Sequence, residues 1–187
     1  DALPDFRPAG HRIAHVATFG GVTWIDDSKA TNPPAALASL QAYDPVVWQL
    51  EYATCVKLLN YPDSATAAGS RLRPEAAAAM PAVSADGRTY TFVVPPRFRF
   101  SPPADEAVTA ESFAFALRRD LDHTLNSPAF PFLEDIVGAR GFAAGKRREV
   151  AGIRADGNHL VLRLTKPAPD FLARLAMPFF CAVPLGT

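Results

Sequence analysis

Proline punctuates this chain and limits the length of its helices. The sequence has 18 prolines among 187 residues, and they cluster at 33–34, 95–96, 102–103, 128–131 and 167–169. Proline lacks the backbone N–H that a helix interior uses, and its ring clashes with the preceding turn. The clusters therefore exclude long uninterrupted helices and predict a chain of short elements.

The composition is that of an ordinary folded protein. Hydrophobic residues make up 49% of the chain, which is enough for a core. Nineteen Lys and Arg balance nineteen Asp and Glu, so the net charge attracts no nucleic acid. No segment has the ~18 consecutive apolar residues of a membrane span, and the N-terminal DALPDFRPAG lacks the features of a secretory signal. We expect no nucleic-acid partner, no membrane span and, for the chain as written, a cytoplasmic location.

The two cysteines, Cys55 and Cys181, are far apart in the sequence. They form no CxxC pair, and no histidine stands at the spacing of a zinc site. We therefore expect no metal. The residues alone leave two alternatives open, buried thiols or one long-range disulfide.

The first 48 residues have the pattern of a small α/β unit. The segments RIAHVAT and VTWID alternate apolar and polar residues on either side of a Gly-Gly turn, which predicts a β-hairpin. Asn32 is a suitable N-cap for a helix over 33–43, and a strand follows from Pro45. The prediction is a strand–strand–helix–strand unit.

Residues 49–187 are predicted to form an α+β lobe, so the whole chain is of the mixed α/β class. The clearest signal is a helix over 110–121, because Thr109 is a good N-cap before an amphipathic run. Asp156-Gly157 marks a hairpin. The other expected elements are a helix over 48–59, strands over 86–94, 98–103 and 179–184, and a short helix over 168–176.

Three motifs in the first 48 residues resemble the C-terminal domain of MurD-type Mur ligases, the ATP-dependent enzymes that add D-glutamate to UDP-N-acetylmuramoyl-alanine. They are GHR at 10–12, DDSKATN at 26–32 and AALASLQAYDPVVW at 35–48. The resemblance implies that Arg12 and Asp27 contact nucleotide, and that Lys29 and Thr31 lie on the D-glutamate and phosphate side. A loop before a helix N-terminus also offers N–H groups to an anion.

The same loop has a plainer interpretation as helix-capping and solvated-loop chemistry. Composition alone favours capping, whereas the resemblance favours a nucleotide loop. The sequence contains no G-x-x-x-x-G-K-[ST] phosphate loop. We therefore expect no enzyme activity and no cofactor, with ADP or ATP bound only if the ligase-like loop retains binding.

A second set of motifs, over residues 42–187, resembles the front part of peptide/nickel-type solute-binding proteins of ABC importers. The motifs include ATCVKLLNYPD, SADGRTYTFVV, VTAESFAFALRRDL and LTKPAPDFLARLAMPFFCAVP, in this order. The resemblance implies an extracytoplasmic protein that closes two lobes over an oligopeptide and delivers it to an ABC permease. Because such proteins tolerate disulfides, it also implies that Cys55 and Cys181 lie close enough to bridge. It assigns no peptide-binding residues.

The two resemblances overlap at AYDPVVWQL, residues 42–50, and together they indicate a chimera of segments 1–48 and 49–187. The function expected is that of an incomplete solute-binding protein with an oligopeptide-type ligand, weak or inactive as a fragment. One alternative is a Mur ligase fragment without catalytic competence, and another is a chimera with no function.

Overall fold

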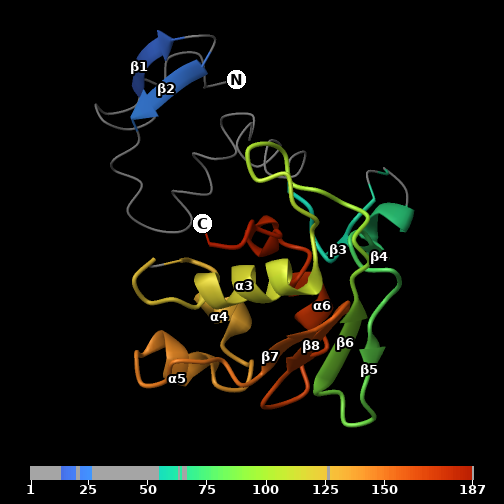
Figure 1. The fold of residues 1–187 in the computed structure, drawn as a ribbon. Helices are drawn as coiled ribbons and strands as arrows, with labels where there is room; N and C mark the ends of the chain where they lie inside the picture. Colours follow the sequence, from blue (N-terminus) through green and yellow to red (C-terminus); the bar gives the residue numbers. More distant parts are fainter. Residues whose placement is uncertain are drawn as a thin grey trace, which may run out of the picture. The chain divides into compact units, whose positions relative to one another are not determined.

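The computed structural model describes residues 14–19, 22–26, 55–62, 64, 67–125 and 127–186. The chain divides into two compact units, Asp1–Leu50 and Glu51–Thr187. Each is described by itself (Figure 1).

The first unit contains a β-hairpin. Strand β1, Ala14–Phe19, pairs antiparallel with β2, Val22–Asp26, and the register shifts between His15 and Ala17. The hairpin predicted from the Gly-Gly turn is therefore confirmed. The predicted helix over 33–43 and the strand from Pro45 lie outside the described residues.

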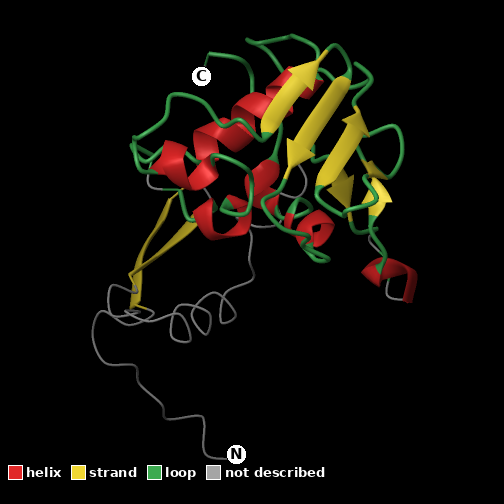
Figure 2. Ribbon diagram, turned by 90° about the horizontal axis from the view of Figure 1, so that it is seen from below, coloured by secondary structure: helices red, strands yellow, loops and turns green. Residues whose placement is uncertain are grey.

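The second unit is built on an antiparallel sheet in the order β5-β6-β8-β7. Its strands are Ala82–Val83, Thr89–Val93, His159–Arg163 and Ile153–Asp156, respectively. Tyr90 and Phe92 on β6 and Leu160 and Leu162 on β8 are buried, whereas their neighbours along each strand are more exposed. This period of two directs one face of the sheet into the core, and Figure 2 shows helices gathered on one side of it.

Helix α3, Ala110–Asp120, packs against β7 and β8 and buries Phe113 and Leu117 between itself and the sheet. Its N-terminus is closed by a reciprocal cap. The hydroxyl of Thr109 accepts from the Ser112 N–H at 3.3 Å, and the hydroxyl of Ser112 accepts from the Thr109 N–H at 3.1 Å. The predicted helix and its N-cap are confirmed, with Ser112 in the position that Glu or Gln usually occupies.

The other described helices are short, as the proline clusters predict. They are the 3-10 helix η1 at Ala67–Ser70, α4 at Phe130–Leu133, α5 at Ala139–Ala143, α6 at Phe171–Arg174 and the 3-10 helix η2 at Pro178–Phe180. Pro131 stands in the first turn of α4 and Pro178 at the start of η2, where a missing N–H costs little. Among the described residues, no helix combines the length and apolarity needed to cross a membrane.

The predicted helix over 48–59 is wrong in its described part. Residues 55–58 are irregular, and β3, Leu59–Asn60, pairs with β4, Arg73–Pro74. Leu58 and Leu59 are both buried although they are adjacent in the chain. A short apolar run buried on both sides resembles a helix in sequence, which explains the error.

Two predicted strands are also corrected. Residues 179–184 include the end of η2 and an irregular segment, because Pro178 and Pro184 bracket it and prevent a continuous ladder. Residues 98–103 contribute one isolated bridge, between Arg99 and Ala107.

Candidate functional site

The residues that the ligase resemblance singles out, Arg12, Asp27, Lys29 and Thr31, lie outside the described residues. Strand β2 ends at Asp26, directly before Asp27. The assignment of a nucleotide loop to these positions therefore stays a prediction.

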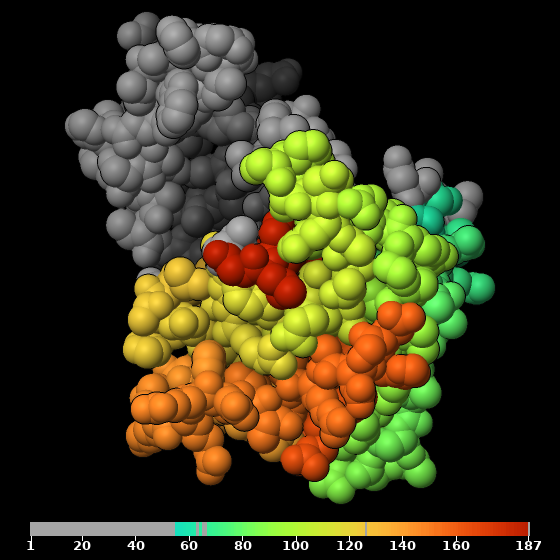
Figure 3. Space-filling view, in the orientation of Figure 1, coloured from blue at the N-terminus to red at the C-terminus, as the bar shows by residue number. Residues whose placement is uncertain are grey.

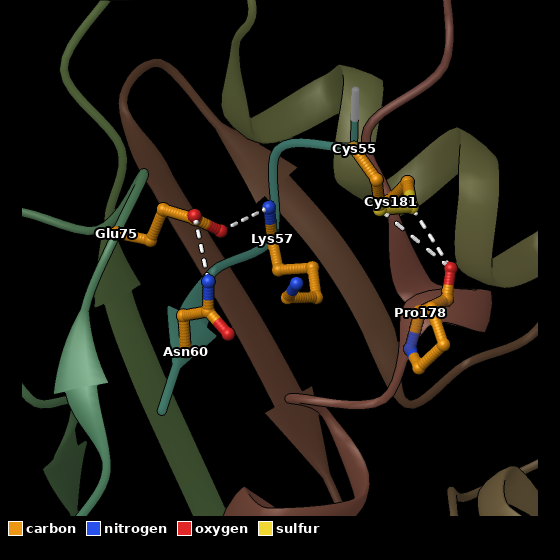
Figure 4. The surroundings of a disulfide bond; sticks show 6 residues. All are labelled: Cys55, Lys57, Asn60, Glu75, Pro178 and Cys181. Carbon is orange, nitrogen blue, oxygen red and sulfur yellow. Dashed lines mark hydrogen bonds between the residues drawn. A yellow bond between two sulfur atoms is a disulfide. The ribbon is translucent and has the colours of Figure 1, made fainter. Parts of the chain in front are cut away.

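A disulfide joins Cys55 and Cys181, with their Cα atoms 5.4 Å apart and 126 positions apart in the sequence. Both sulfurs point toward the carbonyl oxygen of Pro178, which lies 2.8 Å from Cys181 Sγ and 3.6 Å from Cys55 Sγ (Figure 4). A disulfide has no S–H, so either sulfur can donate to this carbonyl only as a free thiol. The structure thus brings together the two ends of the second unit.

Glu75 organises the segment that follows Cys55. Its carboxylate accepts from the backbone N–H of Lys57 at 2.7 Å and from the side-chain amide of Asn60 at 3.0 Å (Figure 4). The backbone N–H groups of Glu75 and Ala77 donate to the Leu58 carbonyl at 3.0 and 3.3 Å. These bonds extend the contact between the segment after Cys55 and the residues after β4. Lys57 is buried, and this burial lowers its pKa, while the charge of Glu75 acts in the opposite direction.

The last described residues form a strap, Cys181–Gly186, that lies along the loop 97–108. The Ala182 N–H donates to the Val56 carbonyl at 3.0 Å, and the Leu185 N–H donates to the Glu106 carboxylate at 3.0 Å. Figure 3 shows the red C-terminal residues against the yellow-green residues of this loop.

The loop beneath the strap is held at several points. Phe100 donates to the Glu106 carbonyl and Val108 to the Phe98 carbonyl, both at 2.9 Å. The guanidinium of Arg97 donates to the Ala77 carbonyl at 3.1 Å. The loop and the strap each expose a large apolar side chain, Phe98 at 36% and Leu185 at 48%. Together they form a surface, the loop–strap surface, with apolar, cationic and anionic side chains.

A cavity of about 670 Å³ lies where α3, α4 and α5 meet, and Asp120, His123, Phe130 and Arg140 are among its lining residues. Burial raises the pKa of Asp120 to about 6, against a hydrogen bond from Ser127 and the charge of Arg119. The hydroxyl of Ser127 donates to this carboxylate at 3.1 Å. Within the described part of the chain, no group of three or more His, Cys, Asp or Glu residues is arranged to hold a metal ion.

Asp135 is the centre of a structural ion-pair network. Arg174 donates to it at 3.0 Å, and Lys166 lies 3.4 Å away. Burial raises its pKa, but the hydrogen bonds from Arg174 and Lys166 outweigh burial and leave the pKa below its ordinary value. Because Arg174 lies on α6, its bond to Asp135 ties α6 to the residues after α4. Arg174 also pairs with Asp170, the N-cap residue of α6, at 2.9 Å.

Sequence reasoning missed the roles of Glu75, Glu106 and Arg97. Each acts through a partner distant in the chain, so no local motif distinguishes it from an ordinary surface charge.

Residues 71–184 match the family model described as bacterial extracellular solute-binding proteins, family 5, middle. The chain belongs to this family. Its second unit supplies the matched residues, and the family's description places its members outside the cytoplasm.

Solved structures of solute-binding proteins resemble this family 5 chain in fold. A Bacillus anthracis oligopeptide ABC transporter substrate-binding domain has a TM-score of 0.65 and 25% identity, over 75% of this chain and 26% of its own. The Escherichia coli murein tripeptide binding protein MppA has a TM-score of 0.63 and 25% identity, over 75% of this chain and 26% of its own. Listeria monocytogenes OppA bound to peptide has a TM-score of 0.66 at 23% identity, over 75% of this chain and 27% of its own. At this identity the likeness shows the fold alone. The chain spans about a quarter of each.

The curated proteins that match a short segment, about a quarter of this chain, are ligases. UDP-N-acetylmuramoylalanine–D-glutamate ligase of Streptomyces avermitilis is 67% identical over 48 residues, 26% of this chain and 10% of the enzyme. The Thermobifida fusca ligase is 65% identical over 46 residues, which are 25% of this chain and 10% of that enzyme. The chain spans about a tenth of these ligases. The solute-binding-protein chain thus also carries a short segment similar to MurD ligases, and both resemblances read from the sequence are confirmed.

Proposed function

We propose that the second unit is a peptide-contacting lobe of an ABC importer's solute-binding protein. The observation that carries the proposal is the family match over residues 71–184. The likeness in fold to proteins named as oligopeptide and murein tripeptide binders, at 25% identity, supports a peptide ligand. An ABC permease is the corresponding partner.

The loop–strap surface has the chemistry that a peptide needs. Phe98 and Leu185 offer exposed apolar area to peptide side chains. Glu106 beneath Leu185 offers a carboxylate to the ammonium end of a short peptide. The guanidinium of Arg99 pairs with Asp105 at 3.3 Å, so a peptide carboxylate would compete with Asp105 for it. We assign the contact to this surface.

The lobe alone is expected to bind peptide weakly. A ligand held by one surface buries only part of its area, and many of its polar groups stay in water. We expect a Kd of about 1 mM for tripeptides, equivalent to about 4 kcal/mol of binding free energy.

The test is an NMR titration of the ¹⁵N-labelled chain with a tripeptide library. Shift changes should concentrate in residues 97–108 and 181–186 and should be lost in Phe98→Ser and Leu185→Ser. Val83→Ser, which alters a side chain 48% exposed on β5, serves as the matched control and should leave them intact. Shift changes centred elsewhere, or none at millimolar peptide, would refute the assignment.

For the ligase-like segment we propose no ligase activity and no resident cofactor. Ligation needs two substrates and ATP held in register, and positioning supplies much of its rate; a segment that matches 10% of an enzyme cannot provide this. The assay is phosphate release with UDP-N-acetylmuramoyl-alanine, D-glutamate and ATP. Release above that of a Lys29→Ala variant would contradict the proposal, and a thermal shift with ADP would show whether the loop retains binding.

A further inference from the structure

The disulfide lies where the well-packed part of the lobe ends. On one side, Leu58 and Leu59 are buried, Leu59 pairs with Pro74 of β4, and the Leu58 carbonyl accepts from residues after β4. On the other side, Phe180 is 2% exposed and belongs to the core. No residue from Cys181 to Gly186 is fully buried. The covalent bond therefore joins two chain segments at the edge of the packed core.

Besides the disulfide, the strap is held by hydrogen bonds and by the partial burial of Ala182 against the core. The Ala182 and Leu185 N–H groups bond to Val56 and Glu106, and Glu106 lies on an exposed loop. Single hydrogen bonds of this kind contribute only about 0.5–1.5 kcal/mol each. As a thiol, Cys181 would bond to Pro178, which belongs to its own chain segment and does not anchor it to the lobe.

Both cysteines are partly exposed, so a dissolved dithiol can reach the bond. One thiolate of the dithiol attacks a sulfur and expels the other cysteine as a thiolate. Its second thiolate then closes the dithiol to a disulfide and expels the first cysteine. The cysteines gain two electrons and two protons, and the dithiol loses them.

We propose that Cys55–Cys181 is a redox-sensitive clasp: oxidised, it holds the strap Cys181–Gly186 on the lobe, and reduced, it releases the strap while the core stays folded. Release would also carry Leu185 away from the loop–strap surface. Only this last consequence rests on the proposed function.

The experiment measures ¹⁵N relaxation on the full chain before and after reduction with dithiothreitol, and again after reoxidation. Order parameters of Ala182, Val183, Leu185 and Gly186 should fall on reduction from about 0.85 to below about 0.6 and recover on reoxidation. Amides of β6 and β8 should keep their values. A strap that stays rigid, or a core whose signals collapse, would overturn the clasp.

Two variants separate the covalent anchor from the other contacts. Cys55→Ala with Cys181→Ala should show the released strap without reductant and no response to it. Glu106→Ala should loosen only Leu185 and Gly186 in the oxidised form. If the double variant does not fold, reversible reduction of the unaltered chain still tests whether the disulfide holds the strap. Peptide titration of both redox forms is a separate measurement, so failure of peptide binding leaves the relaxation result interpretable.

Discussion

The central sheet and the strap belong to one lobe but are held by different interactions. Strands β6 and β8 pair over five residues each, from Thr89–Arg163 to Val93–His159, and bury Phe92 and Leu160 completely. The strap is joined to the lobe by one disulfide, by hydrogen bonds from Ala182 and Leu185 and by partial burial of Ala182, and none of its residues is fully buried. The sheet is stable because many small contacts cooperate, whereas on our proposal the disulfide is the main anchor of the strap.

The strongest test of this contrast removes that linkage. Cys55→Ser with Cys181→Ser should lower the free energy of unfolding by about 5 kcal/mol, because the bond closes a loop of 126 positions. Urea unfolding measures the loss. The unaltered chain in dithiothreitol should match the variant, and a difference below about 1 kcal/mol would show that the strap region is held by other contacts.

The next test weakens the sheet instead. Phe92→Ala should lower the free energy of unfolding by about 4 kcal/mol, because it leaves a cavity beneath β6. Val93→Ala, at a neighbouring position 40% exposed, is the control and should cost less than about 1 kcal/mol. Equal losses in the two variants would mean that the buried face of β6 does not carry the stability.

A smaller effect is expected at the C-terminal end of α3. The pKa of Asp120 is raised from 3.8 to about 6, so between pH 4 and 6 the folded state binds more protons than the unfolded state. Stability is present at low pH and is lost as pH rises through this window. Asp120→Asn should therefore stabilise the chain at pH 7 by about 1–2 kcal/mol, after allowance for solvent screening, and change little at pH 4.

Asp122→Asn is the control of opposite sign. Hydrogen bonds from the Thr124 N–H and hydroxyl lower the pKa of Asp122, so its contribution is present at neutral pH and is lost on acidification. This variant should be less stable than the unaltered chain at pH 7. Urea titrations at pH 4 and 7 measure both, and the same sign for both variants would refute the environments assigned to them.

The smallest effect concerns the N-terminal end of α3, which packs on the sheet. Thr109→Ala removes one half of the reciprocal cap and should cost about 1 kcal/mol. Thermal unfolding of the variant measures it. No change in Tm would show that Ser112 alone caps the helix.

The sequence predicted the sheet and α3 because their signals are local. Thr109 before an amphipathic run, alternation through Tyr90 and Phe92, and the turn at Gly157, whose φ is +56°, each act within a few residues. The segments around Cys55 and Cys181 were assigned a helix and a strand, and neither forms. Cys55 bonds to Cys181, 126 positions away, and Lys57 and Asn60 bond to Glu75, 18 and 15 positions away. No pattern within a few residues contains these partners. For the same reason the cysteines alone left buried thiols and a disulfide as open alternatives, and nothing in the sequence marked Glu75 or Glu106.

The disulfide also determines how the lobe would respond to mechanical tension. A pull applied to the chain before Cys55 and after Cys181 passes directly through the sulfur–sulfur bond, because the two cysteines lie side by side at 5.4 Å between Cα atoms. The sheet and α3 lie within the closed loop and carry none of this load. In the oxidised form the folded core is mechanically bypassed, and in the reduced form the same pull would act on β3 and η2 first.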